Sequence, residues 1–146
     1  MLTKRHDNTQ WENELNERKT LKYYKVGKKK IGYDHCYRNN VNSQFLAMAR
    51  INAIGLEEAK KRGCSFYNAT CKLCSYEEED LVHFAIQCPK LESIRNKELI
   101  NEDILDPEER LIHILFEQKR YQETGKMLKS MWYKRKYLLD QIVAVT

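Results

Sequence analysis

Four residues in one short stretch have the types and spacing that bind a metal ion: Cys71, Cys74, His83 and Cys88. Two cysteines separated by two residues fit on one tight turn, so both sulfurs can point at the same ion. Three thiolates and one imidazole favour tetrahedral Zn²⁺ over cations that prefer oxygen ligands. Because protein side chains fill all four positions, we expect one structural Zn²⁺ ion and no catalytic water.

The residues between Cys74 and Pro89 predict the helices that position His83 and Cys88. Four consecutive acidic residues, from Glu77 to Asp80, precede a helical apolar repeat and favour the start of a helix there. Pro89 disfavours α conformation at Cys88 and favours a new helix after it. We therefore expect Cys88 at a break between two helices, where the chain can bend toward the metal.

Three other interpretations fit the same residues. The cysteines could be incidental thiols, with His83 a packed histidine. The CxxC could be a redox pair, although no βαβ pattern surrounds it. Cys64, which precedes Cys71 by seven residues, could replace His83 in a four-cysteine site. The agreement between the CxxC and the cysteine at the helix break favours the zinc site with His83, and Cys36, adjacent to His35, is expected to be an ordinary thiol.

Composition indicates an intracellular protein with no membrane span. Of the 146 residues, 42% are hydrophobic and 32% are charged, and the mean hydropathy is −0.75. The chain has no apolar run of about 18 residues, and its first residues show no apolar signal segment. The odd cysteine count, with a metal site among those cysteines, favours a reducing compartment.

Helical spacing of apolar residues predicts a mainly α fold, a helical domain with a CCHC zinc knuckle and at most one small β-hairpin at the CxxC. Helices are expected over 8–30, from Ser43 toward Gly55, over 56–62, over 89–99, from Asp106-Pro107 onward and from about Gln122 into the tail. Gly63 is expected to end the 56–62 helix in left-handed conformation. The predicted organisation is a basic N-terminal helical segment (1–42), helices that flank the knuckle at 71–88 (43–100), and a C-terminal helical pair (101–146).

Charge is distributed unevenly along the chain, whose net charge is +5. Residues 1–76 and 111–146 are basic overall, and residues 77–110 are acidic. Basic segments suggest an anionic partner such as nucleic acid, although a solvated lysine-rich surface explains them equally well. Tyrosines are interleaved with the basic residues near position 28, and Arg50 and positions 134–136 are expected to face solvent. The residues expected to contact phosphates are Lys28, Lys29, Lys30, Arg50, Lys60, Lys61, Arg62, Lys72, Lys134, Arg135 and Lys136.

Four stretches, 49–56, 71–74, 79–84 and 88–91, together resemble the C-terminal zinc-knuckle region of non-LTR retrotransposon reverse transcriptases. The resemblance is most specific over 45–95 and extends more loosely upstream and downstream. It implies that Cys71, Cys74, His83 and Cys88 hold zinc, and that the chain engages RNA or DNA during target-primed reverse transcription. The spacing from Cys74 to His83 is longer than in retroviral nucleocapsid knuckles, so the binding mode of those knuckles does not carry over.

Catalysis is not expected from this chain alone. The resembled parent protein is an RNA-directed DNA polymerase, but this sequence has no Asp-Asp pair to hold two catalytic metals and no evident endonuclease carboxylate cluster. We expect a non-catalytic module that binds RNA or DNA without strong sequence specificity, with the polymerase body of the parent protein as another candidate partner. Two alternatives are a zinc-fastened helical protein-interaction domain and a decayed retroelement fragment without selected function.

Overall fold

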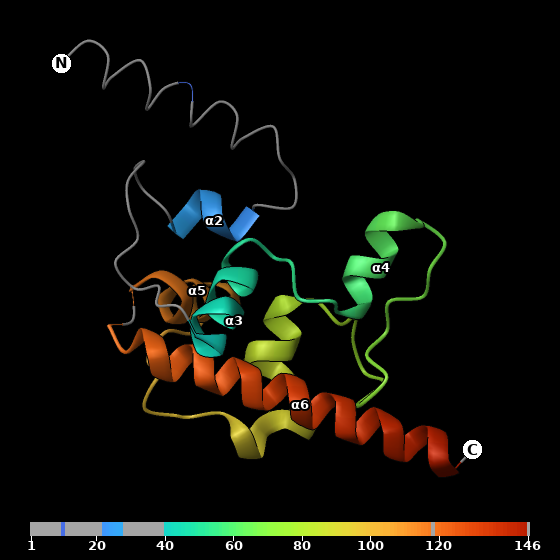
Figure 1. Ribbon diagram of the computed structural model, residues 1–146. Helices are drawn as coiled ribbons and strands as arrows, with labels where there is room; N and C mark the ends of the chain where they lie inside the picture. The colour runs from blue at the N-terminus through green and yellow to red at the C-terminus, as the bar shows by residue number, and fades with distance from the viewer. Residues whose placement is uncertain (1–9, 11–21, 28–39, 118, 146) are drawn as a thin grey trace, which may run out of the picture.

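The computed structural model describes residues 10, 22–27, 40–117 and 119–145 of the chain (Figure 1). These residues are mainly helical, as predicted, and their β pairing is limited to one antiparallel bridge between Thr70 and Glu78. None of the helices in this part of the chain combines the length and apolar character needed to span a bilayer. In chain order the helices are α2 (Lys22–Gly27), α3 (Val41–Arg50), α4 (Glu57–Gly63), the π-helix η2 (His83–Gln87), the 3₁₀-helix η3 (Pro89–Ile94), α5 (Pro107–Ile112), the π-helix η4 (His113–Glu117) and α6 (Tyr121–Val145).

The first turns of α3 and α6 are fastened together. Asn40 caps α3 by accepting the backbone N–H of Ser43 at 2.9 Å, and its side-chain amide donates to Gln122 at 3.0 Å. Gly125, in the first turns of α6, faces α3 so closely that a Cβ atom there would lie 2.1 Å from the carbonyl oxygen of Asn42. The glycine that weakens α6 by propensity therefore allows the two helices to meet.

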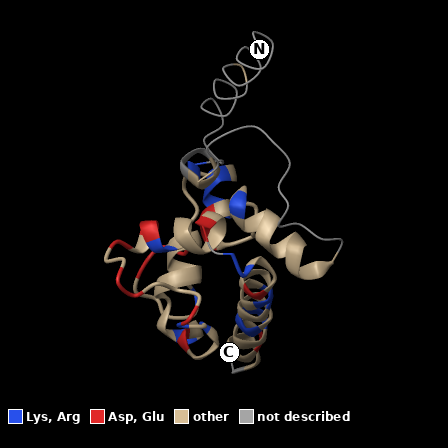
Figure 2. Cartoon of the chain, turned by 90° about the vertical axis from the view of Figure 1, so that its left-hand side faces the viewer, with Lys and Arg blue, Asp and Glu red and all other residues tan. Residues whose placement is uncertain are grey.

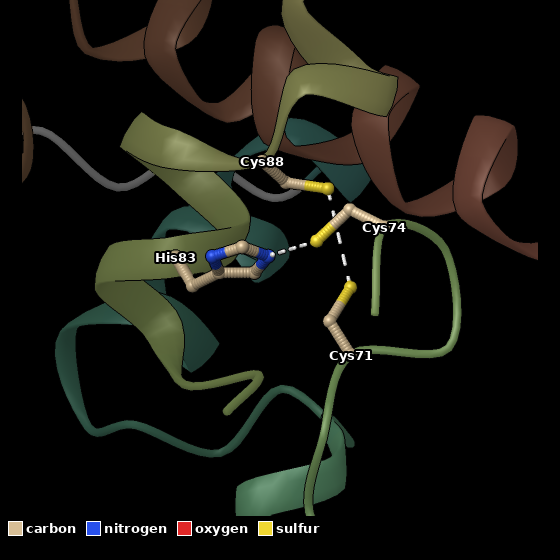
Figure 3. Close-up of side chains that lie close together, drawn as sticks. All are labelled: Cys71, Cys74, His83 and Cys88. Atoms are coloured by element: carbon tan, nitrogen blue, oxygen red, sulfur yellow. Dashed lines mark hydrogen bonds between the residues drawn. The ribbon is translucent and has the colours of Figure 1, made fainter. Parts of the chain in front are cut away.

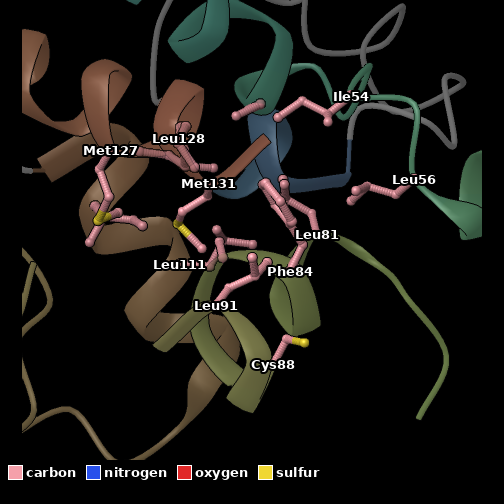
Figure 4. Close-up of a cluster of buried hydrophobic side chains, with 14 of the residues drawn as sticks. Ile54, Leu56, Leu81, Phe84, Cys88, Leu91, Leu111, Met127, Leu128 and Met131 are labelled. Atoms are coloured by element: carbon pink, nitrogen blue, oxygen red, sulfur yellow. The ribbon is translucent and has the colours of Figure 1, made fainter. Parts of the chain in front are cut away.

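One hydrophobic core joins all three predicted segments. Figure 4 shows buried side chains from the loop after α3, from η2 and η3, and from α5 and α6 meeting in a single cluster. Tyr23 of α2 belongs to the same cluster, with only 1% of its surface exposed. Leu46, Phe84, Leu91, Leu111 and Leu128 are all completely buried. The helix that leads to Cys88 is thus part of the main core, and Cys71, Cys74 and Cys88 belong to the same cluster.

The observed C-terminal ends of the helices differ more from the predicted positions than their N-terminal starts do. The Asp106-Pro107 signal starts α5 as predicted, but α3 ends at Arg50, with Asn52 in left-handed conformation at φ 58°. The N–H of Ala53 then donates to the carbonyl of Met48 at 2.7 Å, which closes the helix end. Gly63, predicted to be left-handed, has no positive φ, and η3 stops at Ile94, before the predicted Leu99.

Two arginines cap the carbonyl ends of the π-helices. Arg95 donates to the carbonyl oxygens of Ala85 and Phe84 at 2.9 and 3.1 Å. Arg50 donates to the carbonyl of Leu115 at 2.6 Å, and its guanidinium lies 4.7 Å from the centre of a phenylalanine ring of η4. The prediction that Arg50 faces solvent and contacts phosphate is therefore wrong: only 3% of its surface is exposed, because its charge is used to satisfy a helix end.

Candidate metal centre

The CxxC lies on a tight turn held by backbone hydrogen bonds. The bridge between Thr70 and Glu78 closes the segment, and the N–H of Cys71 donates to the carbonyl of Glu77 at 2.7 Å. The N–H of Ser75 donates to the carbonyl of Cys71 at 2.9 Å, and Ser75 itself has a φ of 63°. This turn is the small hairpin-like element expected at the CxxC, and it directs both sulfurs to one side.

His83 is the first residue of the π-helix η2, and Cys88 directly follows that helix. Asp80 caps the helical segment by accepting the N–H of His83 at 2.8 Å, as expected for an acidic helix start. The N–H of Cys88 then donates to the carbonyl of His83 at 2.7 Å, a bond between residues five apart. The π turn places residues 83 and 88 one above the other, so both side chains face the CxxC turn. Cys88 lies between η2 and η3, at the predicted break.

Figure 3 shows the three sulfurs and the imidazole facing a common centre. Their ligand atoms all lie within 4.8 Å of one another. The Cys74 sulfur is 3.3 Å from Nε2 of His83, and the sulfurs of Cys71 and Cys88 are 4.0 Å apart. Sulfurs of a tetrahedral zinc site with bonds of about 2.3 Å lie about 3.8 Å apart. All four residues are buried, so they form a single closed site of the structural zinc type.

The protonation of the cluster fits metal binding. The pKa of Cys71 is lowered despite burial, because the neighbouring thiol of Cys88 donates a hydrogen bond to the Cys71 thiolate. The same contact, together with burial, raises the pKa of Cys88. Contact with Cys71 also raises the pKa of His83, against the effect of burial. A divalent cation would stabilise all three thiolates.

The second imidazole nitrogen of His83 has an acidic neighbour. Nδ1 is buried and has no hydrogen-bond partner among the described residues. The nearest carboxylate oxygen, from Glu77, lies 3.7 Å away on a side chain that is 60% exposed. Zinc-bound histidines commonly donate their other N–H to a carboxylate, so a small rotation of Glu77 would orient the ring with Nε2 toward the metal.

A buried ion pair lies directly beside the sulfurs. Arg135 of α6 donates two hydrogen bonds to Glu79, at 2.8 and 2.7 Å, and Glu79 also accepts the N–H of Glu57 at 3.0 Å. An oxygen of Glu79 is 4.0 Å from the Cys71 sulfur. Burial, the largest single effect, lowers the pKa of Arg135, but the hydrogen bonds with Glu79 and the negative charges of Glu79 and Glu57 together raise it. The knuckle, α4 and α6 are therefore joined by charge as well as by apolar packing.

Arg135 was predicted to contact phosphate from the solvent side of the last helix, and this prediction is wrong. Only 5% of its surface is exposed, and its guanidinium donates two hydrogen bonds to Glu79. Its neighbour Lys134 is half-buried and Lys136 is exposed. No local pattern in the sequence marks Glu57 and Glu79 as the buried partners of Arg135.

The remaining predicted residues fall into three groups. Lys60, Lys61, Arg62 and Lys72 are exposed on α4 and the knuckle. Cys64 is exposed and is not one of the clustered ligands, so the structure favours His83 over it. The run Lys28, Lys29 and Lys30 and the thiol of Cys36 lie outside the described residues.

Comparison with known proteins identifies no relative: no protein-family model, curated protein or solved structure matches the chain. The class that the site and fold define is a helical protein with a buried Cys₃His metal centre.

Proposed function

We propose that this protein is a zinc-organised, non-catalytic module that binds RNA or DNA, corresponding to the C-terminal tail of a retrotransposon reverse transcriptase. The resemblance over 45–95 supports this proposal, because its metal positions are the four residues that cluster. The observation that carries it is a surface of basic and aromatic side chains next to the metal centre.

That surface is formed by the end of α4, the turn after it and the first residue past Cys71. Phe66 stands at the tip of the turn with 97% of its side chain exposed. The ammonium groups of Lys60 and Lys72 each lie 5.9 Å from the centre of the Tyr67 ring. Lysines around the exposed Phe66 and the half-buried Tyr67 are suited to nucleic acid, because cations follow the phosphates while rings stack on bases.

The cations of this surface already have weak partners. Lys61 lies 3.3 Å from a carboxylate oxygen of Glu78, and Arg62 lies 3.4 Å from one of Glu58. The pair of Lys61 with Glu78 is exposed, and such pairs contribute only about 0–1 kcal/mol, so a phosphate can replace the Glu78 carboxylate at small cost. The pair of Arg62 with Glu58 is partly buried, and Arg62 also donates to the carbonyl of Asn52 at 3.0 Å. Lys61 is therefore the more available phosphate contact of the two.

Binding of the zinc-loaded full chain to fluorescent RNA and DNA oligonucleotides, measured by anisotropy over a range of salt concentrations, tests the proposal. Each phosphate contact should lower log K by about 0.7 to 0.9 per log unit of salt. Replacing Lys61 and Arg62 together by alanine should weaken binding and flatten this slope. The matched control, Lys90→Ala with Lys97→Ala, removes the same charge from exposed positions elsewhere. Absence of binding at low salt, or binding that does not depend on salt, would reject the proposal.

The alternative of a protein-interaction domain calls for an uncovered apolar patch on the helices of 111–118 or 127–142. In the described part of these helices, most large apolar residues are buried or half-buried against the core, and the exposed ones are Tyr133, Tyr137, Ile142 and Val143 of α6. Self-association in sedimentation without any affinity for nucleic acid would favour this alternative.

A further inference from the structure

The outer face of α6 carries a stripe of lysines and tyrosines. Lys126, Lys129, Tyr133, Lys136 and Tyr137 recur at spacings of three and four residues, which places them on one side of the helix. Tyr133 and Tyr137 are 55% and 57% exposed, Lys126 and Lys136 are exposed, and Lys129 is half-buried. The opposite side of α6 supplies buried residues to the core. Figure 2 shows basic residues recurring along this helix, while acidic residues gather on the loops at the left of the view.

The three lysines of this stripe differ from the basic residues around α4. Among the described residues, Lys126, Lys129 and Lys136 form no ion pair, whereas Lys60, Lys61, Arg62 and Lys72 all lie within 4 Å of a carboxylate. The acidic residues of α6, Glu123 and Asp140, lie beyond the two ends of the stripe. A polyanion would thus meet three positive charges here without displacing any carboxylate.

The two tyrosine rings are held in place by neighbours. The Tyr133 ring packs against the buried Phe45 of α3, with ring centres 6.3 Å apart. The ammonium group of Lys134 lies 5.4 Å from the centre of the Tyr137 ring. Because these contacts restrict the rings while leaving more than half of each side chain exposed, each ring is a ready platform on which a base can stack.

We infer that the outer face of α6 binds single-stranded nucleic acid, with the lysines on phosphates and the tyrosines stacked on bases. This inference rests on the proposed function: it specifies single-stranded nucleic acid as the ligand and adds α6 as a second contact surface. Residues 126–137 span about 17 Å of helix, which is long enough to contact several nucleotides of one strand. A single strand is required because its bases can leave their own stack, and such stacking tolerates any sequence.

The test measures anisotropy of the zinc-loaded full chain with a fluorescent single strand of about 12 nucleotides and with the matching duplex, a length that exceeds the span of the stripe. Replacing Lys126, Lys129 and Lys136 by alanine should weaken single-strand binding at least about tenfold at low salt and lower the salt slope by about 2. The control, Lys90→Ala, Lys97→Ala and Lys119→Ala, removes equal charge from exposed positions off the stripe and should have a small effect.

A second variant, Tyr133→Leu with Tyr137→Leu, separates stacking from charge. It should weaken single-strand binding about tenfold or more while leaving the salt slope unchanged, because leucine keeps apolar bulk and helix propensity but has no ring. Zinc content and circular dichroism verify folding of each variant. The lysine and tyrosine variants are independent, so failure of one to fold leaves the other as the test.

Three results would overturn the inference. Loss of binding in the Lys61 and Arg62 variant but none in either α6 variant would keep the proposed function and reject this surface. Equal affinity for duplex and single strand, unaffected by the tyrosine changes, would reject the single-strand assignment. No binding of the wild type to either probe would reject the proposed function and this inference together.

Discussion

His83 and Cys88 connect the zinc ion to the helical core, so their loss should affect both metal content and folding. A closed structural zinc site contributes an apparent binding free energy of about 10–16 kcal/mol in small peptides, against a typical domain stability of about 5–15 kcal/mol. We predict that protein purified under reducing conditions contains one zinc per chain, and that His83→Ala and Cys88→Ser lose zinc and melt at lower temperature. Elemental analysis and thermal denaturation measure both effects.

The matched control for these variants is Cys64→Ser. Cys64 is an exposed thiol outside the cluster, so this change should keep one zinc per chain and the wild-type melting temperature. If Cys88→Ser kept its zinc and its melting temperature, the assignment of Cys88 as a ligand would be wrong.

The pair of Glu79 and Arg135 should matter far more than an exposed ion pair. Glu79→Gln removes the charge that accepts both hydrogen bonds and leaves Arg135 with the carboxylate of Glu57, 3.6 Å away, as its remaining charged partner. This change should lower the free energy of unfolding by about 3 kcal/mol. Lys61→Gln breaks the exposed pair with Glu78 and should cost at most about 1 kcal/mol. Chemical denaturation of the zinc-loaded proteins measures both. Similar losses of unfolding free energy in the two variants would show that the buried pair stabilises the protein no more than an exposed pair does.

Single-residue roles were predictable from the sequence where partners are near in the chain. The four ligands span residues 71–88, and their types and spacing are enough to identify them. Arg50 and Arg135 were predicted wrongly because their partners, Leu115 and Glu79, are 65 and 56 residues away. From sequence alone, a basic residue on a helix is predicted to be solvent-exposed. The prediction changes only when the distant element that accepts its hydrogen bonds is known.

At the scale of elements, the contact between α3 and α6 depends on the absence of a side chain at Gly125. Gly125→Ala places a methyl group against the backbone of Asn42 and should destabilise the protein by about 2 kcal/mol, because backbone moves less easily than a side chain. Gly63→Ala, the control, meets nothing within 4 Å and should leave stability unchanged or raise it by up to about 1 kcal/mol. Denaturant unfolding distinguishes them, and equal effects would contradict the close contact.

Helix starts carried stronger sequence signals than helix ends or helix types. The Asp106-Pro107 pair and the acidic run before His83 both marked starts correctly. The left-handed residue after α3 is Asn52, not a glycine, and the role of Asn52 became visible only from the closing hydrogen bond. Neither π-helix was predicted, because apolar spacing alone does not separate α turns from π turns in a short segment.

For the whole molecule, metal removal should loosen one part of the core selectively. A chelator should increase hydrogen exchange over 64–98 and over the half of α6 that contains Arg135, because Glu79 next to Cys71 joins the knuckle to that helix. The first turns of α6, packed on α3, should keep more of their protection. Mass spectrometry of the exchanged protein maps the change, and uniform loss along α6 would contradict this coupling.

The mainly α fold was predictable because apolar periodicity is a local property, and the structure confirms it. The arrangement of the helices was not predictable to the same extent. It depends on contacts between distant positions, such as Gly125 with Asn42 and Tyr23 with the common core, and no local pattern encodes which helices meet.

The π turn between His83 and Cys88 makes chain length, and not only residue type, a requirement of the metal centre. Deleting one residue there, such as the exposed Gln87, would let the segment relax to an ordinary α turn, which keeps the two ligands on one face because residues four apart lie one above the other. Inserting one residue would instead turn the last cysteine away from the other three ligands. An insertion in this segment should therefore damage the metal centre more than a deletion or an exposed substitution does.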